Sequence, residues 1–227
     1  MAVSRTFDIL ERLNREPPKE DILAGKQNGK WVTYSTPEYA QYADYVSYGL
    51  LSMGYKKGDK IATIANNRPE WNFVDMGMAQ AGIVHVPIYP TISQEDYRYI
   101  LNHSEVKGVI ISNKNIYNKV RPIIRKSRKI RDIFSFDEVE GTRSWVEIIE
   151  AGRNHEGTYR QQVREIRSSI DPDEMVTLIY TSGTTGDPKG GYAVPPESGE
   201  QPGEHFQSAQ ARLPTQSPQF PSSLPCL

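Results

Sequence analysis

The chain has 227 residues, and its 27 lysines and arginines nearly balance its 28 aspartates and glutamates. This balance gives no overall electrostatic field that would indicate nucleic acid as a partner. The single cysteine, Cys226, lies next to the C-terminus, so a disulfide framework, a zinc–cysteine cluster and a cysteine nucleophile within residues 1–190 are all excluded.

Targeting and metal-binding signals are weak. The N-terminal stretch MAVSRTFDILERLNRE is too charged for a signal peptide, and no window reaches the about 20 apolar residues needed to span a bilayer. We therefore expect a cytoplasmic protein and leave peripheral membrane contact open. The histidines at 85, 103, 155 and 205 show no metal-ligand spacing, so no metal site is predicted in the chain.

Apolar periodicity and turn residues predict an alternation of helices and strands along most of the chain. In the first part of the chain we expect a helix over 7–15, a hairpin over 22–34 and a helix from Thr36 to about Gly54. Strands and helices then alternate: a strand over 60–65, a helix over 70–81, a strand over 83–89, a helix from Ser93 to about Asn102 and a strand over 108–112. After these we expect a basic helix that Pro122 bends or interrupts, a strand over 130–136, one or two polar helices over 144–169 and a strand over 175–180.

Two helix starts carry capping signals. Thr36-Pro37 places a hydroxyl cap before a proline at the first helical position, and Ser93 to Asp96 resembles a capping box. Tyrosines recur at three-residue spacing in the first of these helices, at 39, 42, 45 and 48. Such a stripe favours a helix packing face over a ligand wall.

Strands alternating with helices of this length predict parallel pairing, with helices on both faces of the sheet. Ligands bind beyond the carboxyl ends of the strands in sheets of this kind. The last apolar strand leads directly into the sequence YTSGTTGDPKG, residues 180–190, and we call residues 181–190 of this sequence the glycine-rich loop. The loop is therefore expected at the binding edge of the sheet.

The composition of the glycine-rich loop favours phosphate binding. Glycines at 183, 186 and 190 let backbone N–H groups approach phosphate oxygens closely. Ser182, Thr184 and Thr185 add hydroxyl donors, and Lys189 adds a positive charge for a polyphosphate. The alternative interpretation is a surface turn that binds no ligand. Such a turn would account for the glycines, but it accounts less well for three hydroxyls and a lysine placed after a buried strand.

Other nucleotide-binding classes fit the loop poorly. A P-loop NTPase or kinase of the Walker type needs G-x-x-x-x-G-K-[ST], whereas here the lysine follows Gly186 by three residues and precedes Gly190. The chain also lacks G-x-G-x-x-G, so dinucleotide binding has no support.

YTSGTTGDPKG resembles the signature loop of the acyl-adenylate-forming superfamily, the AMP-dependent synthetases and ligases. The resemblance extends over residues 21–190 and includes WVTY at 31–34, GDKIA at 58–62, NRPEW at 67–71 and VPIYPT at 86–91. The last two forms are similar to long-chain fatty acid–CoA ligases in particular. A ligase for a medium-chain or aromatic acid is the alternative within the family.

The resemblance implies the large α/β adenylating domain, with parallel sheets flanked by helices, of which residues 1–190 would be the N-terminal part. It implies a reaction in which a carboxylate attacks ATP to give acyl-AMP and pyrophosphate, followed by transfer to coenzyme A. ATP, Mg²⁺, coenzyme A and a fatty acid are the expected cofactor and substrates, and no protein partner is expected. The β and γ phosphates would be held by Thr181, Ser182, Gly183, Thr184, Thr185, Gly186 and Lys189. No catalytic residue is expected in this chain.

Residues 191–227 have a different character. They hold seven of the chain's 16 prolines, five serines and five glutamines, and no lysine. This composition predicts a disordered tail, and a natural Pro-rich interaction tail is one alternative. A change of reading frame explains the composition better, because codons compatible with 191–201 and 217–226 permit, one nucleotide later, VMLSHRNLVSN and ALSFLPLCHV, which resemble the family's continuation. We therefore expect a truncated chain without ligase activity.

A basic run follows the third predicted parallel strand, with positive side chains at 119, 121, 125, 126, 128, 129 and 131. A solvated helix face is the simpler interpretation of such a run. A role in binding phosphate or a lipid surface is the alternative.

Overall fold

The computed structural model describes residues 5–27 and 29–181, together with the backbone of 189–193. The helices are α1 (Asp8–Leu13), α2 (Thr36–Ser52), α3 (Pro69–Gln80), α4 (Gln94–His103), α5 (Lys114–Ile124), α6 (Val146–Asn154) and α7 (Glu156–Ser169). The strands are β1 (Leu23–Gln27), β2 (Lys30–Tyr34), β3 (Lys60–Ile64), β4 (Val84–Ile88), β5 (Gly108–Ile111), β6 (Asp132–Ser135), β7 (Arg143–Ser144), β8 (Thr177–Thr181) and β9 (Lys189–Ala193).

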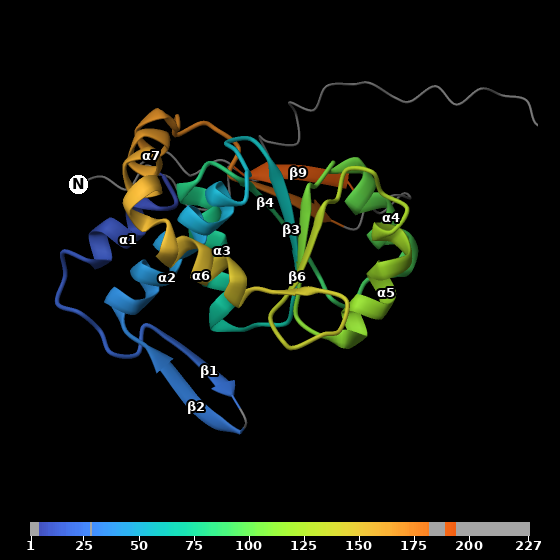
Figure 1. Ribbon diagram of the computed structural model, residues 1–227, viewed down its shortest axis with the longest axis horizontal. Coiled ribbons are helices and arrows are strands. Elements are labelled where there is room, and N and C mark those ends of the chain that lie inside the picture. Colours follow the sequence, from blue (N-terminus) through green and yellow to red (C-terminus); the bar gives the residue numbers. More distant parts are fainter. Residues whose placement is uncertain (1–4, 28, 182–188, 194–227) are drawn as a thin grey trace, which may run out of the picture.

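Most strands form one sheet, in the order β7-β6-β5-β3-β4-β8-β9. Every neighbouring pair from β7 to β8 is parallel, and β9 runs antiparallel to β8 at the edge. Strands β1 and β2 form a separate antiparallel hairpin that projects from the body (Figure 1). The predicted α/β class with a parallel sheet is therefore confirmed.

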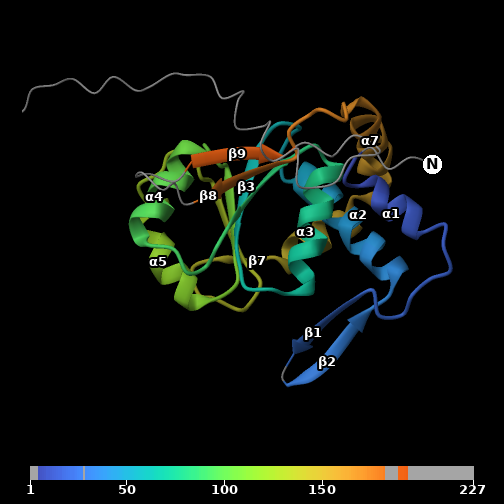
Figure 2. The same ribbon diagram turned by 180° about the vertical axis from the view of Figure 1, so that it is seen from behind.

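Helices cover both faces of the sheet (Figures 1 and 2). Residues that alternate along the strands divide between two cores: Ile61, Ile110 and Phe134 pack with α2, α3 and α6, whereas Ala62, Ile64 and Val109 pack with α4 and α5. Parallel strands buried on both faces need near-continuous apolar sequence, which is what the strand segments show.

The tyrosine stripe of α2 is a packing face, as predicted. Tyr39 and Tyr48 are buried, and Tyr42 stacks on Phe73 of α3 with ring centroids 4.6 Å apart. The predicted capping box of α4 is also present, because Ser93 Oγ accepts from Asp96 N while the Asp96 carboxylate accepts from Ser93 N.

The predicted cap of α2 was wrong by one residue. Ser35 is the N-cap, with a reciprocal pair of hydrogen bonds to Glu38, and Pro37 follows in the first turn. The Thr36 hydroxyl instead accepts a hydrogen bond from Lys19 N at 3.2 Å. Glu38 decides the position, because a capping box needs its acid three residues after the cap.

Two short strands were not predicted from the sequence. Strand β7 has only two residues, and β9 extends through residues 191–193, so the boundary expected after Gly190 falls inside a strand. Backbone pairing with β8 requires no apolar pattern in β9. The remainder of the predicted disordered tail, residues 194–227, lies outside the described residues.

The closest helix contact joins α2 to α6 through glycines. A Cβ at Gly152 would lie 1.9 Å from the Tyr45 carbonyl oxygen, and a Cβ at Gly49 would lie 2.0 Å from the Ile148 carbonyl oxygen. The two helix backbones therefore touch, and any side chain at either position must push the helices apart.

We expect Gly152→Ala to destabilise the fold by about 1–3 kcal/mol, because the cost of overpacking exceeds the gain in helix propensity. Gly157→Ala in α7 is the matched control, since nothing lies within 4 Å of its Cβ position. The control should be neutral or stabilising by up to about 1 kcal/mol. Urea unfolding measures both variants, and equal stability of the two would contradict the close approach of α2 and α6.

Candidate functional site

The loops at the carboxyl ends of the parallel strands gather along one edge of the sheet. The chain leaves β3 toward α3 on one face of the sheet, but leaves β4 and β5 toward α4 and α5 on the other. Strand β3 lies between β4 and β5. Neighbouring connections that diverge in this way open a crevice between them, which is the usual ligand position in an open α/β sheet.

The larger pocket at this edge has a volume of about 490 Å³. Its walls come from the segments after β3 and β4, from α3 and from β8, and are lined by Ala65, Asn66, Asn67, Trp71, Pro87, Ile88, Tyr89, Pro90, Thr91 and Ile179. None of these side chains carries a charge, so the pocket offers apolar surface, the amides of Asn66 and Asn67 and the hydroxyls of Tyr89 and Thr91. Its β8 wall ends two residues later at Thr181, where the glycine-rich loop begins.

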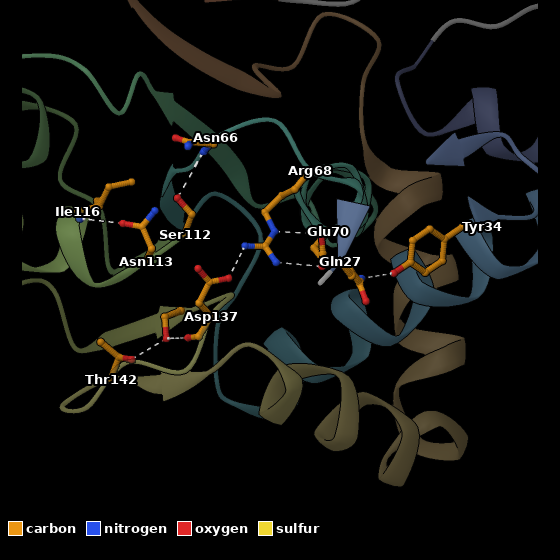
Figure 3. A network of polar contacts seen from close by, with 11 residues as sticks. Gln27, Tyr34, Asn66, Arg68, Glu70, Ser112, Asn113, Ile116, Asp137 and Thr142 are labelled. Carbon is orange, nitrogen blue, oxygen red and sulfur yellow. Dashed lines mark hydrogen bonds and ion pairs between the residues drawn. The ribbon is translucent and has the colours of Figure 1, made fainter. Parts of the chain in front are cut away.

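A smaller pocket of about 240 Å³ lies beside it, on the β5 side of β3. Its lining is polar and includes Asn66, Arg68, Ser112 and Asp137. Asn66 N donates to Ser112 Oγ at 3.4 Å, which ties the loop after β3 to the end of β5 (Figure 3).

Arg68 is the centre of the polar network between these loops (Figure 3). Its Nε and Nη2 atoms donate to the two carboxylate oxygens of Glu70, each at 3.0 Å, and its Nη1 donates to Asp137 at 2.9 Å. The guanidinium also lies over the Phe136 ring, 4.7 Å from its centroid. The Glu70 side chain is 7% exposed, whereas that of Asp137 is 53% exposed.

Burial alone would lower the pKa of Arg68, but the bonds to Glu70 and Asp137 outweigh it and the pKa is raised. Arg68 therefore stays charged and fixes the loops after β3 and β6 against each other. Two anchors at this edge of the sheet were missed in the sequence, Arg68 and Asp137. NRPEW was noted as a landmark, but a pair 69 residues apart has no local sequence signal.

The predicted phosphate-binding residues begin and end at paired positions. Thr181 is the exposed last residue of β8, and Lys189, the first residue of β9, is its partner in the antiparallel register. The two ends of the predicted loop are thus brought together at the carboxyl end of β8. Ser182, Gly183, Thr184, Thr185 and Gly186 lie outside the described residues.

Tyr180, which precedes the loop, is anchored to α4. Its hydroxyl lies 2.7 Å from His103 Nδ1, and its ring packs edge-on against the His103 and Tyr99 rings. Burial raises the pKa of Tyr180, so its hydroxyl stays protonated. This contact fixes β8 immediately before the glycine-rich loop.

His85 on β4 is buried, with Nδ1 2.6 Å from the Asp75 carboxylate and its ring against Trp71. Within residues 5–27 and 29–181, no three His, Cys, Asp or Glu side chains are grouped so that they could hold a metal ion. No helix in the described part of the chain is long and apolar enough to cross a membrane.

Comparison with known proteins identifies the family. The model of the AMP-binding enzyme family matches residues 10–192. The long-chain-fatty-acid–CoA ligase ACSBG2 of Xenopus laevis is 30% identical over 173 residues, which cover 74% of this chain and 23% of that protein. The long-chain-fatty-acid–CoA ligase FadD15 of Mycobacterium bovis is 30% identical over 176 residues, which cover 78% of this chain and 29% of that protein.

A solved structure, the anthranilate CoA ligase AuaEII in complex with anthranoyl-AMP, superimposes with a TM-score of 0.64 at 20% identity, over 84% of this chain and 34% of that one. At this identity the likeness concerns the fold alone. The chain belongs to the AMP-binding enzyme family. It spans about a quarter of the length of the curated relatives it matches.

Removing Arg68 should destabilise the fold strongly. In Arg68→Met the buried Glu70 carboxylate loses its partner, and we expect a loss of about 3–5 kcal/mol. Asp137→Asn removes only the exposed arm of the network and should cost at most about 1 kcal/mol. Urea unfolding at neutral pH compares the two, and a loss of at most about 1 kcal/mol in Arg68→Met would contradict the claim that the buried Glu70 carboxylate depends on Arg68.

Proposed function

We propose that this chain is the N-terminal part of the adenylating domain of a long-chain fatty acid–CoA ligase. In this proposal the glycine-rich loop binds the β and γ phosphates of ATP through Thr181, Ser182, Gly183, Thr184, Thr185, Gly186 and Lys189. The main support for this role is the position of the loop, which starts at the carboxyl end of β8, beside the 490 Å³ pocket. The names of the curated relatives support the long-chain fatty acid as substrate.

The proposed chemistry has two steps. The fatty acid carboxylate attacks the α-phosphorus of ATP, forming acyl-AMP and releasing pyrophosphate. The thiol of coenzyme A then attacks the acyl carbonyl and displaces AMP. The loop contributes by stabilising negative charge on the leaving pyrophosphate with hydroxyl groups, backbone N–H groups and the Lys189 ammonium. Mg²⁺ would supply further charge neutralisation when bound with ATP.

We further propose that the 227-residue chain carries out neither step. Residues 1–190 form the N-terminal part of the domain, and residues 191–227 result from one extra nucleotide near the Lys189–Gly191 codons. The composition of 191–227 and the family-like sequence in the shifted frame support this. A cytoplasmic location remains the prediction made from the sequence, and peripheral membrane contact stays an open alternative.

The alternative within the family is a ligase for a medium-chain or aromatic acid. The anthranilate CoA ligase AuaEII, which has the same fold, supports this alternative, because anthranilate is an aromatic acid. A non-catalytic fragment with a Pro-rich interaction segment is the alternative from another class.

The decisive assay uses two proteins: the 227-residue chain and the longer chain obtained after removal of one nucleotide at the Lys189–Gly191 codons. Pyrophosphate release is measured with ATP, coenzyme A and palmitate, octanoate or benzoate. We expect release by the longer chain, fastest with palmitate, and none by the 227-residue chain. Activity of the short chain would refute the proposed inactivity, and a preference for octanoate or benzoate would refute the long-chain assignment.

In the longer chain, Lys189→Ala should lower the rate of adenylate formation by about 100-fold, because a charge that stabilises the departing pyrophosphate is lost. Lys56→Ala is the matched control, since Lys56 is an exposed lysine distant from the sheet's carboxyl edge. Single-turnover formation of acyl-AMP measures both variants. Unchanged rates in Lys189→Ala would contradict the role given to the loop.

A further inference from the structure

A third pocket, of about 440 Å³, lies between α5 and the segment that joins β6 to β7. Helix α5 packs on the face of the sheet opposite α2 and α3 (Figure 1). The pocket is lined by Lys114, Tyr117, Asn118, Arg121, Arg125, Ile133, Glu140 and Gly141. We call it the α5 groove. It shares no lining residue with the two pockets at the carboxyl edge of the sheet.

The cations of the α5 groove share one side of the helix. Positions 114, 118, 121 and 125 follow the four-, three- and four-residue spacing that places side chains on one stripe. Arg121 and Arg125 are one turn apart, about 6 Å along the axis, and Lys114 is about 10 Å further toward the N-terminus. Like charges one turn apart destabilise a helix, so an anion between Arg121 and Arg125 would stabilise it.

The α5 groove is not neutralised by the described protein. Neighbouring cations in the same basic run do have partners, since Lys129 pairs with Glu105 and Arg131 pairs with Asp132. Among the described residues, no carboxylate forms an ion pair with any of the three groove cations. Glu140, on the opposite wall, is exposed and leaves the lining with three positive side chains against one negative.

One donor in the groove is buried without a partner. The Nε atom of Arg121 is shielded from solvent, and within the described part of the chain no hydrogen-bond acceptor reaches it. A buried donor left unpaired is costly, and a charged one more so. The guanidinium is held beside the Tyr117 ring, 5.8 Å from its centroid, and is therefore restricted in orientation.

The floor of the α5 groove is built by a specific contact. Tyr117 donates its hydroxyl hydrogen to the Gly141 carbonyl at 3.1 Å, and Gly141 has a positive φ of 87°. A Cβ at Gly141 would lie 2.6 Å from the Tyr117 hydroxyl. Only glycine therefore lets the β6–β7 segment approach α5 this closely and form the groove.

We propose that the α5 groove binds a phosphate-bearing ligand, with one phosphate between Arg121 and Arg125 and a second anionic group near Lys114. Guanidinium groups match phosphate oxygens in paired hydrogen bonds, which lysine cannot make. The groove volume falls within the range of about 300–1,000 Å³ typical of small-molecule sites. A soluble organic phosphate and an anionic phospholipid headgroup share this chemistry. The proposal is independent of the role given to the glycine-rich loop.

The test measures binding of inositol trisphosphate by calorimetry, and of vesicles of phosphatidylcholine with and without phosphatidic acid by co-sedimentation, to the 227-residue chain. Arg121→Gln/Arg125→Gln should weaken binding of the preferred probe about tenfold or more, because two charge-assisted contacts are lost. Lys129→Gln is the control, because it removes a positive charge of the same basic run that already pairs with Glu105. This variant should change the affinity for the probe less than twofold.

The variant Lys189→Ala distinguishes binding in the α5 groove from binding at the glycine-rich loop. It should leave the affinity of the α5 groove for the probe unchanged. Binding of inositol trisphosphate alone identifies a soluble ligand, and binding of phosphatidic acid vesicles alone identifies a lipid headgroup. The proposal would be overturned if the unsubstituted chain bound neither probe.

Equal losses of affinity in Lys129→Gln and in the double variant would overturn it too, because they would indicate general charge attraction. Thermal unfolding of each variant verifies the fold, and Arg125→Gln alone replaces the double variant if that one unfolds.

Discussion

Strand β3 makes backbone hydrogen bonds along both of its edges, to β4 on one side and to β5 on the other, and all three strands run in the same direction. This parallel arrangement brings Ile64, Ile88 and Ile111 to one edge of the sheet. The crossover helices must then lie on the two faces, because a parallel pair cannot be joined by a tight turn. The loops that leave these strands meet in consequence, and both pockets at the carboxyl edge arise from their meeting.

The carboxyl edge is held by charged and polar contacts, whereas the body of the sheet is held by apolar burial. Arg68 joins the loop after β3 to the loop after β6, and Tyr180 joins the end of β8 to α4. Each contact acts on a backbone segment that borders a pocket. The glycine-rich loop therefore starts from a strand end whose position is fixed on the side of α4, which suits a loop that has to present several donors to one polyphosphate.

Much of this fold follows from local sequence. The strands at 60–65, 83–89 and 108–112 and the helices between them were predicted because each apolar run is bounded by turn residues or caps. The α2 cap was misplaced, since Ser35 and Thr36 are chemically equivalent caps and only Glu38 distinguishes them. Strand β9 could not be predicted, because its pairing depends on β8 and not on its own residues.

The site was only partly predictable for a related reason. A glycine-rich loop with hydroxyls and a lysine has a compact signal, so its residues were named from the sequence. The Arg68–Asp137 pair and the α5 groove depend on segments brought together by the sheet. The basic run at 119–131, which includes Arg121 and Arg125, was noted in the sequence. Lys114 was not counted in it, and the wall formed by Glu140 and Gly141, which turns a basic face into a groove, has no sequence signal.

The central claim is that residues 1–190 are the front of a carboxylate-activating enzyme and that residues 191–227 are read in a shifted frame. Determining the nucleotide sequence from the Lys189 codon to beyond the Leu227 codon tests this most directly. The account predicts that removing one nucleotide restores VMLSHRNLVSN after Gly190 and opens a long reading frame. If no single-nucleotide shift restores that segment, the account of the tail is wrong, and residues 191–227 are encoded in the same reading frame as the AMP-binding part of the chain.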